Sequence, residues 1–295
     1  MSIAVAATEF LRRSLAHPDW RGKILYGLLR SIFAIVPIRR RLVLDALEKA
    51  FPEHDEAWRK QTLKGIYRHY SWMIVEFLAA VNDPSLIERM FVEIEGREII
   101  DRLKAENKGC FILSGHFGNW EVTGPWFPRH GYPMEPAARD ADDQSFAALI
   151  ERYRAHLGEH TLRKGAMNVR GMVRDAQSGK WIGLIADQDA GPNAVPVTFL
   201  NRRTTMVEGP AALSLTAKVP LITIYGVRLG PFRHKIRILP AICDGTEGRS
   251  KENIAEYTRR ANAVLEDMVR LAPEQWFWFH RRWKNDPDRP GVKAQ

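Results

Sequence analysis

The sequence predicts an α/β protein with a mostly parallel central sheet flanked by helices, preceded by an N-terminal helical segment that associates with a membrane. Short apolar runs of strand length, such as residues 110–114 and 181–186, alternate with segments of helical periodicity. Strands that alternate with helices form a mostly parallel sheet covered on both faces. The chain has 295 residues, 45% of them hydrophobic, and is therefore long enough to bury one large core.

The chain is expected to divide into an N-terminal helical region, residues 1–90, and an α/β core, residues 91–295. From residue 41 to about 81 the apolar side chains follow a helical period, and Pro52 separates two helices there. The second of these helices is expected over residues 56–81.

Residues 20–41 form a separate apolar segment with basic ends. Its apolar run, residues 24–37, is interrupted by Arg30 and is shorter than the ~20 residues that a membrane-spanning helix needs. An apolar helix with arginines at its ends suits the interface of an anionic membrane. The alternative is a helix that packs on the protein's own core.

The core elements follow in order along the chain. Strands are expected at 91–96, 110–114, 181–186 and 195–200, and a strand pair across Gly230-Pro231 at 220–228 and 234–239. Helices are expected at 99–106, 144–157, 169–177, 209–217 and 251–271. No internal repeat, low-complexity segment or linker interrupts residues 92–284.

A histidine and a glutamate follow the apolar run 110–114. His116 lies just past the predicted strand end, where open α/β sheets form their sites, and Glu121 comes five residues later. On one regular helix these side chains would point apart, but on a strand-to-helix turn they can converge. Glu121 would then accept a hydrogen bond from one ring nitrogen of His116, leaving the other nitrogen to take a proton from a hydroxyl. The alternative is a structural histidine beside a solvated glutamate.

Other charged residues stand at predicted strand ends and loops. Asp187 and Asp189 follow the strand 181–186 and would meet His116 if this strand neighbours 110–114; otherwise they lie in a solvated loop. Arg139, Arg202 and Arg203 are expected in loops, where guanidinium groups can bind a phosphate, or else form ordinary basic surface.

The aromatic run at residues 276–283 is unusual for a chain end. It contains Trp276, Phe277, Trp278, Phe279 and Trp283. Such a run can cover the core, line an acyl-chain site or lie at a bilayer interface. Stacking on RNA is a further option, but no RNA-binding motif accompanies it.

The net charge, the cysteine count and the absence of certain motifs limit the classes of function. The formal net charge of +9 favours an anionic partner such as a membrane, a phosphorylated substrate or nucleic acid. The two cysteines form no disulfide framework, and no secretory signal is recognisable. Nucleotide, zinc and serine-hydrolase sites lack their motifs, so no cofactor or metal is expected.

Several of these motifs together resemble one family, the late acyltransferases of lipid A biosynthesis, within the lysophospholipid acyltransferase group. The resemblance spans about residues 20–284. It rests on five motifs: Ser114-Gly115-His116 through Glu121, Phe51-Pro52-Glu53, Asp187-Gln188-Asp189, Glu208-Gly209-Pro210-Ala211, and Pro273-Glu274-Gln275-Trp276 through Lys284. Two positions depart from the family pattern, Asp45-Ala46 upstream of Phe51 and the acidic stretch 140–143 after Arg139.

The resemblance implies an acyltransferase at the cytoplasmic face of the bacterial inner membrane, held peripherally or monotopically. His116 would be the general base, Glu121 its support, and Arg139 a ligand of the acceptor's phosphate. The donor would be a thioester of acyl carrier protein or CoA, and the acceptor a membrane glycolipid; nucleic acid is not expected. We expect backbone N–H groups of Gly115–Gly118, or an arginine, to stabilise the oxyanion.

Other functions stay open on the sequence. The acidic stretch after Arg139 leaves room for another glycolipid or a lysophospholipid as acceptor. A thioesterase would use water instead of the acceptor. A non-catalytic module that binds anionic lipid or RNA would need no His116–Glu121 pair and would bind nucleic acid in a salt-sensitive way.

Overall fold

The computed structural model describes residues 3–36, 38–137, 144–162 and 169–284. Five helices precede the first strand: α1 (Ile3–Leu15), α2 (Trp20–Ile35), α3 (Arg40–Ala50), α4 (Glu56–Asn82) and α5 (Leu86–Met90). Capping side chains start two of them, because Asp19 accepts a hydrogen bond from the backbone N–H of Arg21 and Asp55 from that of Trp58.

Strands and helices alternate from Phe91 onward. The strands are β1 (Phe91–Glu95), β2 (Cys110–Ser114), β3 (Met134–Ala137), β4 (Trp181–Ile185), β5 (Val195–Phe199), β6 (Arg202–Met206), β7 (Leu221–Gly230) and β8 (Arg233–Cys243). The helices are α6 (Arg97–Ala105), α7 (Trp120–Arg129), α8 (Gln144–His156), α9 (Val169–Gln177), α10 (Gly209–Ala217) and α11 (Lys251–Leu271), followed by a 3₁₀ turn, η1 (Pro273–Gln275).

The central sheet is mixed but mostly parallel. Its strand order is β1-β8-β7-β2-β4-β3, and only the β7–β8 pair is antiparallel among these neighbours. Strand β2 lies in the middle, paired in parallel with β7 and β4, so its carboxyl end adjoins that of β4. The strands β5 and β6 form a separate antiparallel hairpin.

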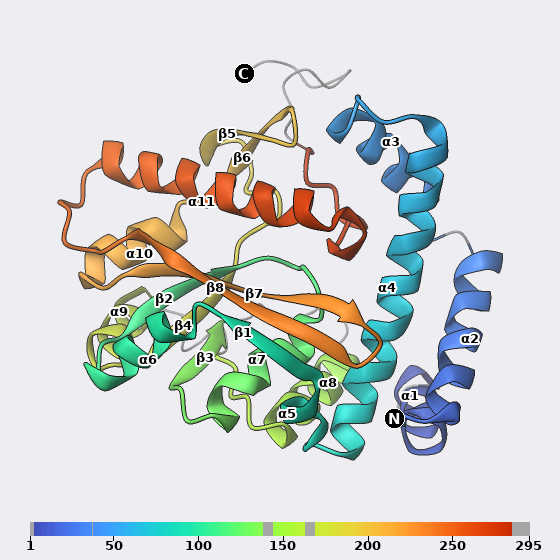
Figure 1. Cartoon of the computed structure of the whole chain (residues 1–295). Coiled ribbons are helices and arrows are strands. Elements are labelled where there is room, and N and C mark those ends of the chain that lie inside the picture. The colour runs from blue at the N-terminus through green and yellow to red at the C-terminus, as the bar shows by residue number, and fades with distance from the viewer. Residues whose placement is uncertain (1–2, 37, 138–143, 163–168, 285–295) are drawn as a thin grey trace.

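Helices cover both faces of this sheet (Figure 1). Alternate residues of β2 point to opposite faces, so Phe111 and Leu113 enter one hydrophobic cluster while Cys110 and Ile112 enter another. The first cluster includes residues of α9, α10 and α11, and the second includes residues of α6, α7 and α8. The expected α/β architecture is therefore confirmed.

The N-terminal helices pack against this sheet domain through α4. Figure 1 shows α4 standing beside the end of the sheet with α2 on its outer side. Residues of α3 and α4 belong to the same cluster as Phe111, and the rings of Tyr26 and Trp72 stack α2 on α4. No helix in the described ranges is both long and apolar enough to cross a membrane. The division into residues 1–90 and 91–295 stays a prediction.

Some sequence-based expectations for the elements were wrong. Arg202 and Arg203 lie in β6 rather than in a loop, because residues 202–206 pair with β5. Strand β3 was not expected, since its four residues, Met-Glu-Pro-Ala, carry no strand pattern.

Candidate active site

His116 lies on the turn between β2 and α7, at the carboxyl edge of the sheet. Two backbone hydrogen bonds to the segment at Gln275–Phe277 hold this turn. The N–H of Gly118 donates to the carbonyl of Gln275 at 3.0 Å, and the N–H of Phe277 donates to the carbonyl of His116 at 2.9 Å. Gly118 has a φ of 62°, and a Cβ there would lie 2.0 Å from the carbonyl oxygen of Gly226. Only glycine fits this turn.

Asp187 is the carboxylate that holds His116. Because β2 and β4 are parallel neighbours with Ser114 beside Ile185, the residues after the two strands meet. The Oδ1 of Asp187 lies 2.8 Å from the Nδ1 of His116, and its Oδ2 accepts the backbone N–H of His116 at 2.7 Å. The prediction that Asp187 meets His116 across neighbouring strands is confirmed. The expectation that Glu121 accepts the His116 ring hydrogen bond is wrong, because Asp187 occupies that position.

The electrostatics of this pair fix the tautomer of His116. Burial alone would raise the pKa of Asp187, but the charge and hydrogen bond of His116 and the 2.8 Å bond from Trp276 Nε1 lower it below its usual range. An ionised carboxylate only accepts, so Nδ1 carries the proton. Burial would lower the pKa of His116, yet Asp187 outweighs it and the pKa is raised. Nε2 is therefore the nitrogen that can take a proton.

An open cavity of about 1660 Å³ adjoins His116. No described residue hydrogen-bonds Nε2, and the His116 side chain keeps 24% of its surface exposed. The walls come from α4, α8, the loop after β4 and the start of α10, with Ile74, Phe146, Ile150, Gln188, Asp189, Pro210 and Leu213 among them. Nε2 is therefore accessible from this cavity.

Glu121 pairs with an arginine that the sequence analysis had not singled out. Its two oxygens accept hydrogen bonds from Arg154 Nη2 at 2.6 Å and Nε at 2.9 Å, and Arg154 Nη1 also reaches Glu151 at 3.0 Å. Burial opposes the charge of Arg154, but Glu121 and the neighbouring carboxylates outweigh it and raise its pKa. Glu121 and Arg154 both line the His116 cavity, and the negative charge of Glu121 contributes to the raised pKa of His116.

Three of the backbone N–H groups expected to form an oxyanion site already donate hydrogen bonds within the protein. Those of His116, Phe117 and Gly118 donate to Asp187, Gly115 and Gln275 respectively. That expectation is therefore wrong for these three groups. The first turn of α7 offers other donors, because no described residue accepts the backbone N–H of Trp120 or Glu121.

The buried carboxylate of Glu76 on α4 holds Asn119, which lies between the His116 turn and α7. The side chain of Glu76 is fully buried and accepts hydrogen bonds from Asn119 Nδ2 at 2.9 Å, His234 Nε2 at 3.0 Å, the Phe232 N–H at 2.8 Å, and Arg228. Burial would raise its pKa, but the charges of Arg228 and His234 lower it. A charge so placed must stay paired, which fixes Asn119 at the start of α7.

His69 holds the same turn one residue earlier. Its Nε2 donates to the carbonyl of Gly118 at 3.0 Å, while its Nδ1 accepts a hydrogen bond from Arg228 Nε at 3.1 Å. Burial and the charge of Arg228 lower the pKa of His69 well below its usual value, consistent with a neutral ring. The imidazole thus joins α4, β7 and the turn that carries His116.

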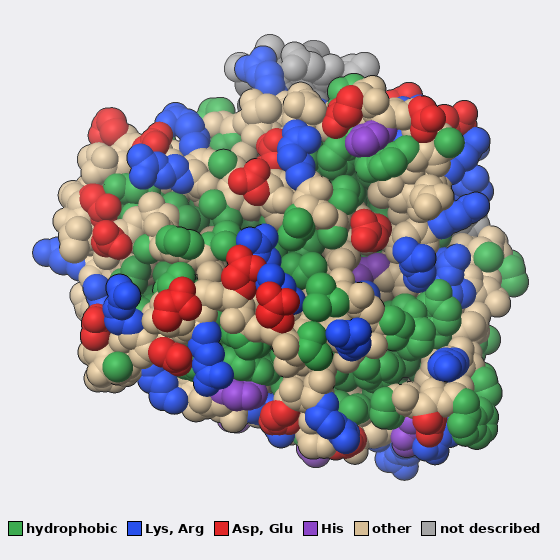
Figure 2. Space-filling view, in the orientation of Figure 1, with side chains coloured by type: hydrophobic (Ala, Val, Ile, Leu, Met, Phe, Trp, Pro, Cys, Tyr) green, Lys and Arg blue, Asp and Glu red, His purple; other side chains and the backbone are tan. Residues whose placement is uncertain are grey.

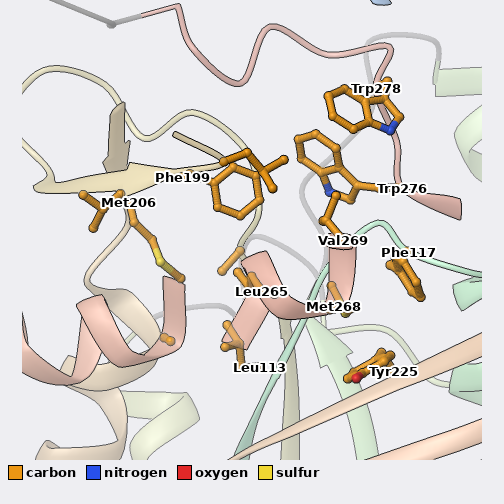
Figure 3. Packing of buried hydrophobic residues seen from close by; sticks show 14 of the residues in the cluster. Leu113, Phe117, Phe199, Met206, Tyr225, Leu265, Met268, Val269, Trp276 and Trp278 are labelled. Atoms are coloured by element: carbon orange, nitrogen blue, oxygen red, sulfur yellow. The ribbon is translucent and has the colours of Figure 1, made fainter. Parts of the chain in front are cut away.

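The aromatic run near the end of the chain covers the core and touches the site. Trp276, Trp278, Phe279 and Trp283 are buried, and Figure 3 shows the indole of Trp276 beside the ring of Phe199 above α11. Phe277 lies 5.8 Å from the ring of His116 between centroids. The sequence left several roles open for this run, and the role of covering the core is confirmed for its buried rings.

The remaining predicted site residues lie apart from the His116–Asp187 pair. Asp189 lines the same cavity and its Oδ1 accepts the Gly191 N–H at 3.1 Å. Arg202 packs its guanidinium 4.6 Å from the centroid of the Trp283 ring and is absent from the described cavity wall. Arg139 lies outside the described residues. Among the described residues, no cluster of His, Cys, Asp or Glu is arranged to hold a metal ion.

A second, smaller cavity of about 100 Å³ lies between α7 and the sheet. Glu121, Arg154 and Trp120 line both cavities, so the two adjoin at the Glu121–Arg154 pair. Apart from this pair, its described walls are mainly apolar, and they contain Ile112, Phe117, Phe127, Met134, Ile185 and Ile224. One further charged residue, Glu159, lies in the wall, and burial raises the pKa of Glu159 to about 8, with a further rise from Glu121 and opposition from Arg154.

Comparison with known proteins assigns the chain to one family. The profile of the family described as bacterial lipid A biosynthesis acyltransferase matches residues 5–285. The lipid A biosynthesis palmitoleoyltransferase of Escherichia coli (strain K12) is 25% identical over 84% of this chain and 80% of its own length. The lipid A biosynthesis lauroyltransferase of the same organism is 23% identical over 89% of this chain and 84% of its own length. The phosphatidylinositol mannoside acyltransferase of Mycobacterium tuberculosis (strain ATCC 25618 / H37Rv) is 24% identical over 73% of this chain and 67% of its own length. The chain therefore belongs to the bacterial lipid A biosynthesis acyltransferase family.

Proposed function

We propose that the protein transfers a fatty acyl group from a thioester of acyl carrier protein or CoA to a hydroxyl group of a membrane glycolipid. The observation that carries this proposal is the oriented His116, whose free Nε2 adjoins a cavity large enough for a sugar head group. A lipid A precursor is the first candidate acceptor, since two relatives are named for lipid A biosynthesis. A mannosylated lipid is the second, since another relative is named for it.

His116 acts as the general base in this proposal. Its Nε2 removes the proton of the acceptor hydroxyl, while Asp187 keeps the Nδ1 proton in place and stabilises the imidazolium. The acceptor oxygen bonds to the thioester carbonyl carbon, forming a tetrahedral oxyanion. When this collapses, the C–S bond breaks and the leaving thiolate takes the proton from the imidazolium.

Two positive features adjoin the reacting atoms. The backbone N–H groups of Trp120 and Glu121, for which no described residue is an acceptor, and the guanidinium of Arg154 would stabilise the developing negative charge. Glu121 keeps Arg154 at the cavity through two hydrogen bonds, so its role is to position that cation. Arg139 and Asp189 remain candidates for contact with the acceptor.

The smaller cavity between α7 and the sheet is proposed to hold the beginning of the acyl chain. It adjoins the His116 cavity at the Glu121–Arg154 pair, and its described walls are mainly apolar. A chain placed there presents its thioester carbonyl near the start of α7. Burial of the chain supplies binding at about 0.8 kcal/mol per methylene group.

We propose further that the protein docks on the cytoplasmic face of the inner membrane through α2. Large apolar side chains recur every four residues along it and stay exposed: Trp20, Ile24, Leu28 and Ile32, with Ile35 beyond them. Figure 2 shows hydrophobic side chains gathered over the part of the molecule where α2 and α4 lie. Basic residues flank the stripe, which suits an anionic bilayer. The basic chain also suits an acidic carrier protein.

Mass spectrometry of membrane glycolipids from cells with and without the gene tests the function. The proposal expects one glycolipid to lose one acyl chain when the gene is absent and to regain it on complementation. Free fatty acid as the sole product of the purified enzyme would identify a thioesterase instead. Unchanged glycolipids, with no acyl transfer by the purified protein, would contradict the proposal.

A further inference from the structure

Glu159 is a buried carboxyl group in the wall of the small cavity. It follows α8 and is only 6% exposed. The carboxyl group occupies space that a side chain at position 124 would fill, because a Cβ on Gly124 of α7 would lie 1.9 Å from Glu159 Oε2. Helix α7 thus leaves a gap at Gly124 that the carboxyl group fills.

The Glu159 carboxyl group has no hydrogen-bond partner among the described residues. Arg154 Nε is its closest described cation, at 3.8 Å from Oε1, but that N–H donates to Glu121. The other bonded nitrogens of Arg154 are directed to Glu121 and Glu151. The 3.8 Å ion pair with Arg154 is thus the contact that the described residues give this carboxyl group, and its hydrogen-bonding capacity stays unused. A buried polar group that makes no hydrogen bond is costly.

We propose that Glu159 determines acyl-chain specificity by hydrogen bonding to a hydroxyl group on the acyl chain. This inference rests on the proposed acyl cavity and names the class of acyl donor, a hydroxylated fatty acyl thioester. The carboxyl group can both donate to and accept from a hydroxyl. A plain hydrocarbon chain in the same position would cover the carboxyl group and leave it without a hydrogen bond, so the site discriminates against it.

Binding of non-transferable donors tests this inference separately from catalysis. The probes are acyl-pantetheine amides, in which an amide replaces the thioester, carrying either dodecanoyl or each positional isomer of hydroxydodecanoyl. Calorimetry with the full chain should show that one isomer binds about 10- to 100-fold more tightly than dodecanoyl. The preference should fall on a single hydroxyl position, because Glu159 has one place in the wall.

Three substitutions assign the preference to the carboxyl group. Glu159→Leu should remove the preference or reverse it, while Glu159→Gln should keep most of it, because an amide also donates and accepts. Gly124→Ala should reduce it by a different route, since the added methyl displaces the carboxyl group. Glu151→Gln is the matched control: Glu151 also bonds Arg154 but is absent from the small cavity's wall, so the preference should persist.

The outcomes separate this inference from the proposed function. Equal or tighter binding of dodecanoyl by the unaltered protein would overturn the inference and leave the acyltransferase intact. A preference that persists in both Glu159→Leu and Gly124→Ala would also overturn it. Failure of every acyl amide to bind would overturn the acyl cavity itself and the inference with it.

Discussion

The Nδ1 of His116 and the Oδ1 of Asp187 lie 2.8 Å apart, although 71 residues separate them in the chain. Parallel pairing of β2 with β4 brings the two strand ends together, and the same carboxylate also accepts hydrogen bonds from the backbone of His116 and from Trp276. The histidine is thereby fixed in ring orientation, tautomer and backbone position by one buried carboxylate.

Asp187→Asn should reduce the rate and move its pH dependence. Asp187 raises the pKa of His116, and the base must be neutral, so activity of the unaltered enzyme is lost as the pH falls through this raised pKa. Removing the carboxylate lowers the pKa of His116, so the acid limb of kcat should move to lower pH while the maximal rate falls at least ~100-fold. The control is Asp244→Asn, at an exposed position outside the cavity wall, for which the acid limb should stay in place. An acid limb that does not move in Asp187→Asn would contradict the assigned pairing.

Glu76→Gln should destabilise the fold. The substitution leaves the buried Arg228 without its carboxylate, which costs roughly 3–5 kcal/mol. Chemical denaturation at neutral pH measures this loss. Glu93→Gln is the control, because Glu93 pairs with Lys235 at the exposed surface, where a pair contributes about 0–1 kcal/mol. Equal effects of the two substitutions would show that the Glu76 network does not stabilise the site.

Glu121→Gln should reduce the rate by about 10-fold or more while leaving the protein folded. The amide cannot accept both N–H groups of Arg154, so the cation loses its fixed place at the cavity. Steady-state kinetics and thermal unfolding measured together separate the two effects. A large drop in Tm with an unchanged rate would give Glu121 a structural role only.

Charges on the exposed stripe of α2 should abolish membrane docking. Leu28 and Ile32 are 44% and 43% exposed, so Leu28→Glu combined with Ile32→Glu removes apolar surface without disturbing the core. Flotation with phosphatidylglycerol-containing vesicles should recover the unaltered protein but not this variant. Val92→Glu, at an exposed position on β1, is the control and should float normally. Equal flotation with neutral vesicles would contradict the electrostatic part of the account.

The sequence was sufficient for elements with strong local patterns. The helix at Lys251–Leu271 and the buried strand at Cys110–Ser114 follow from hydrophobic periodicity alone, and the structure has both. The four-residue β3 has no such pattern, and its pairing with β4 depends on tertiary contacts.

The site was predictable only in part, because strand order decides which strand ends meet. His116 and Asp187 were both expected at strand ends, but their contact depended on β2 and β4 being neighbours. Local spacing favoured Glu121 as the partner of His116, yet a helix 33 residues away supplies Arg154 and draws Glu121 to it. No sequence signal marked Glu159, whose burial depends on the gap at Gly124.

The most direct test of the account measures acyl transfer by purified His116→Ala and unaltered protein with an acyl carrier protein thioester and a lipid A precursor. Loss of the general base should reduce the rate by about 10²–10⁴-fold. The protein should still unfold in one cooperative thermal transition, since the ring is partly exposed at the cavity. A His116→Ala protein that transfers the acyl chain at the unaltered rate would contradict the central claim.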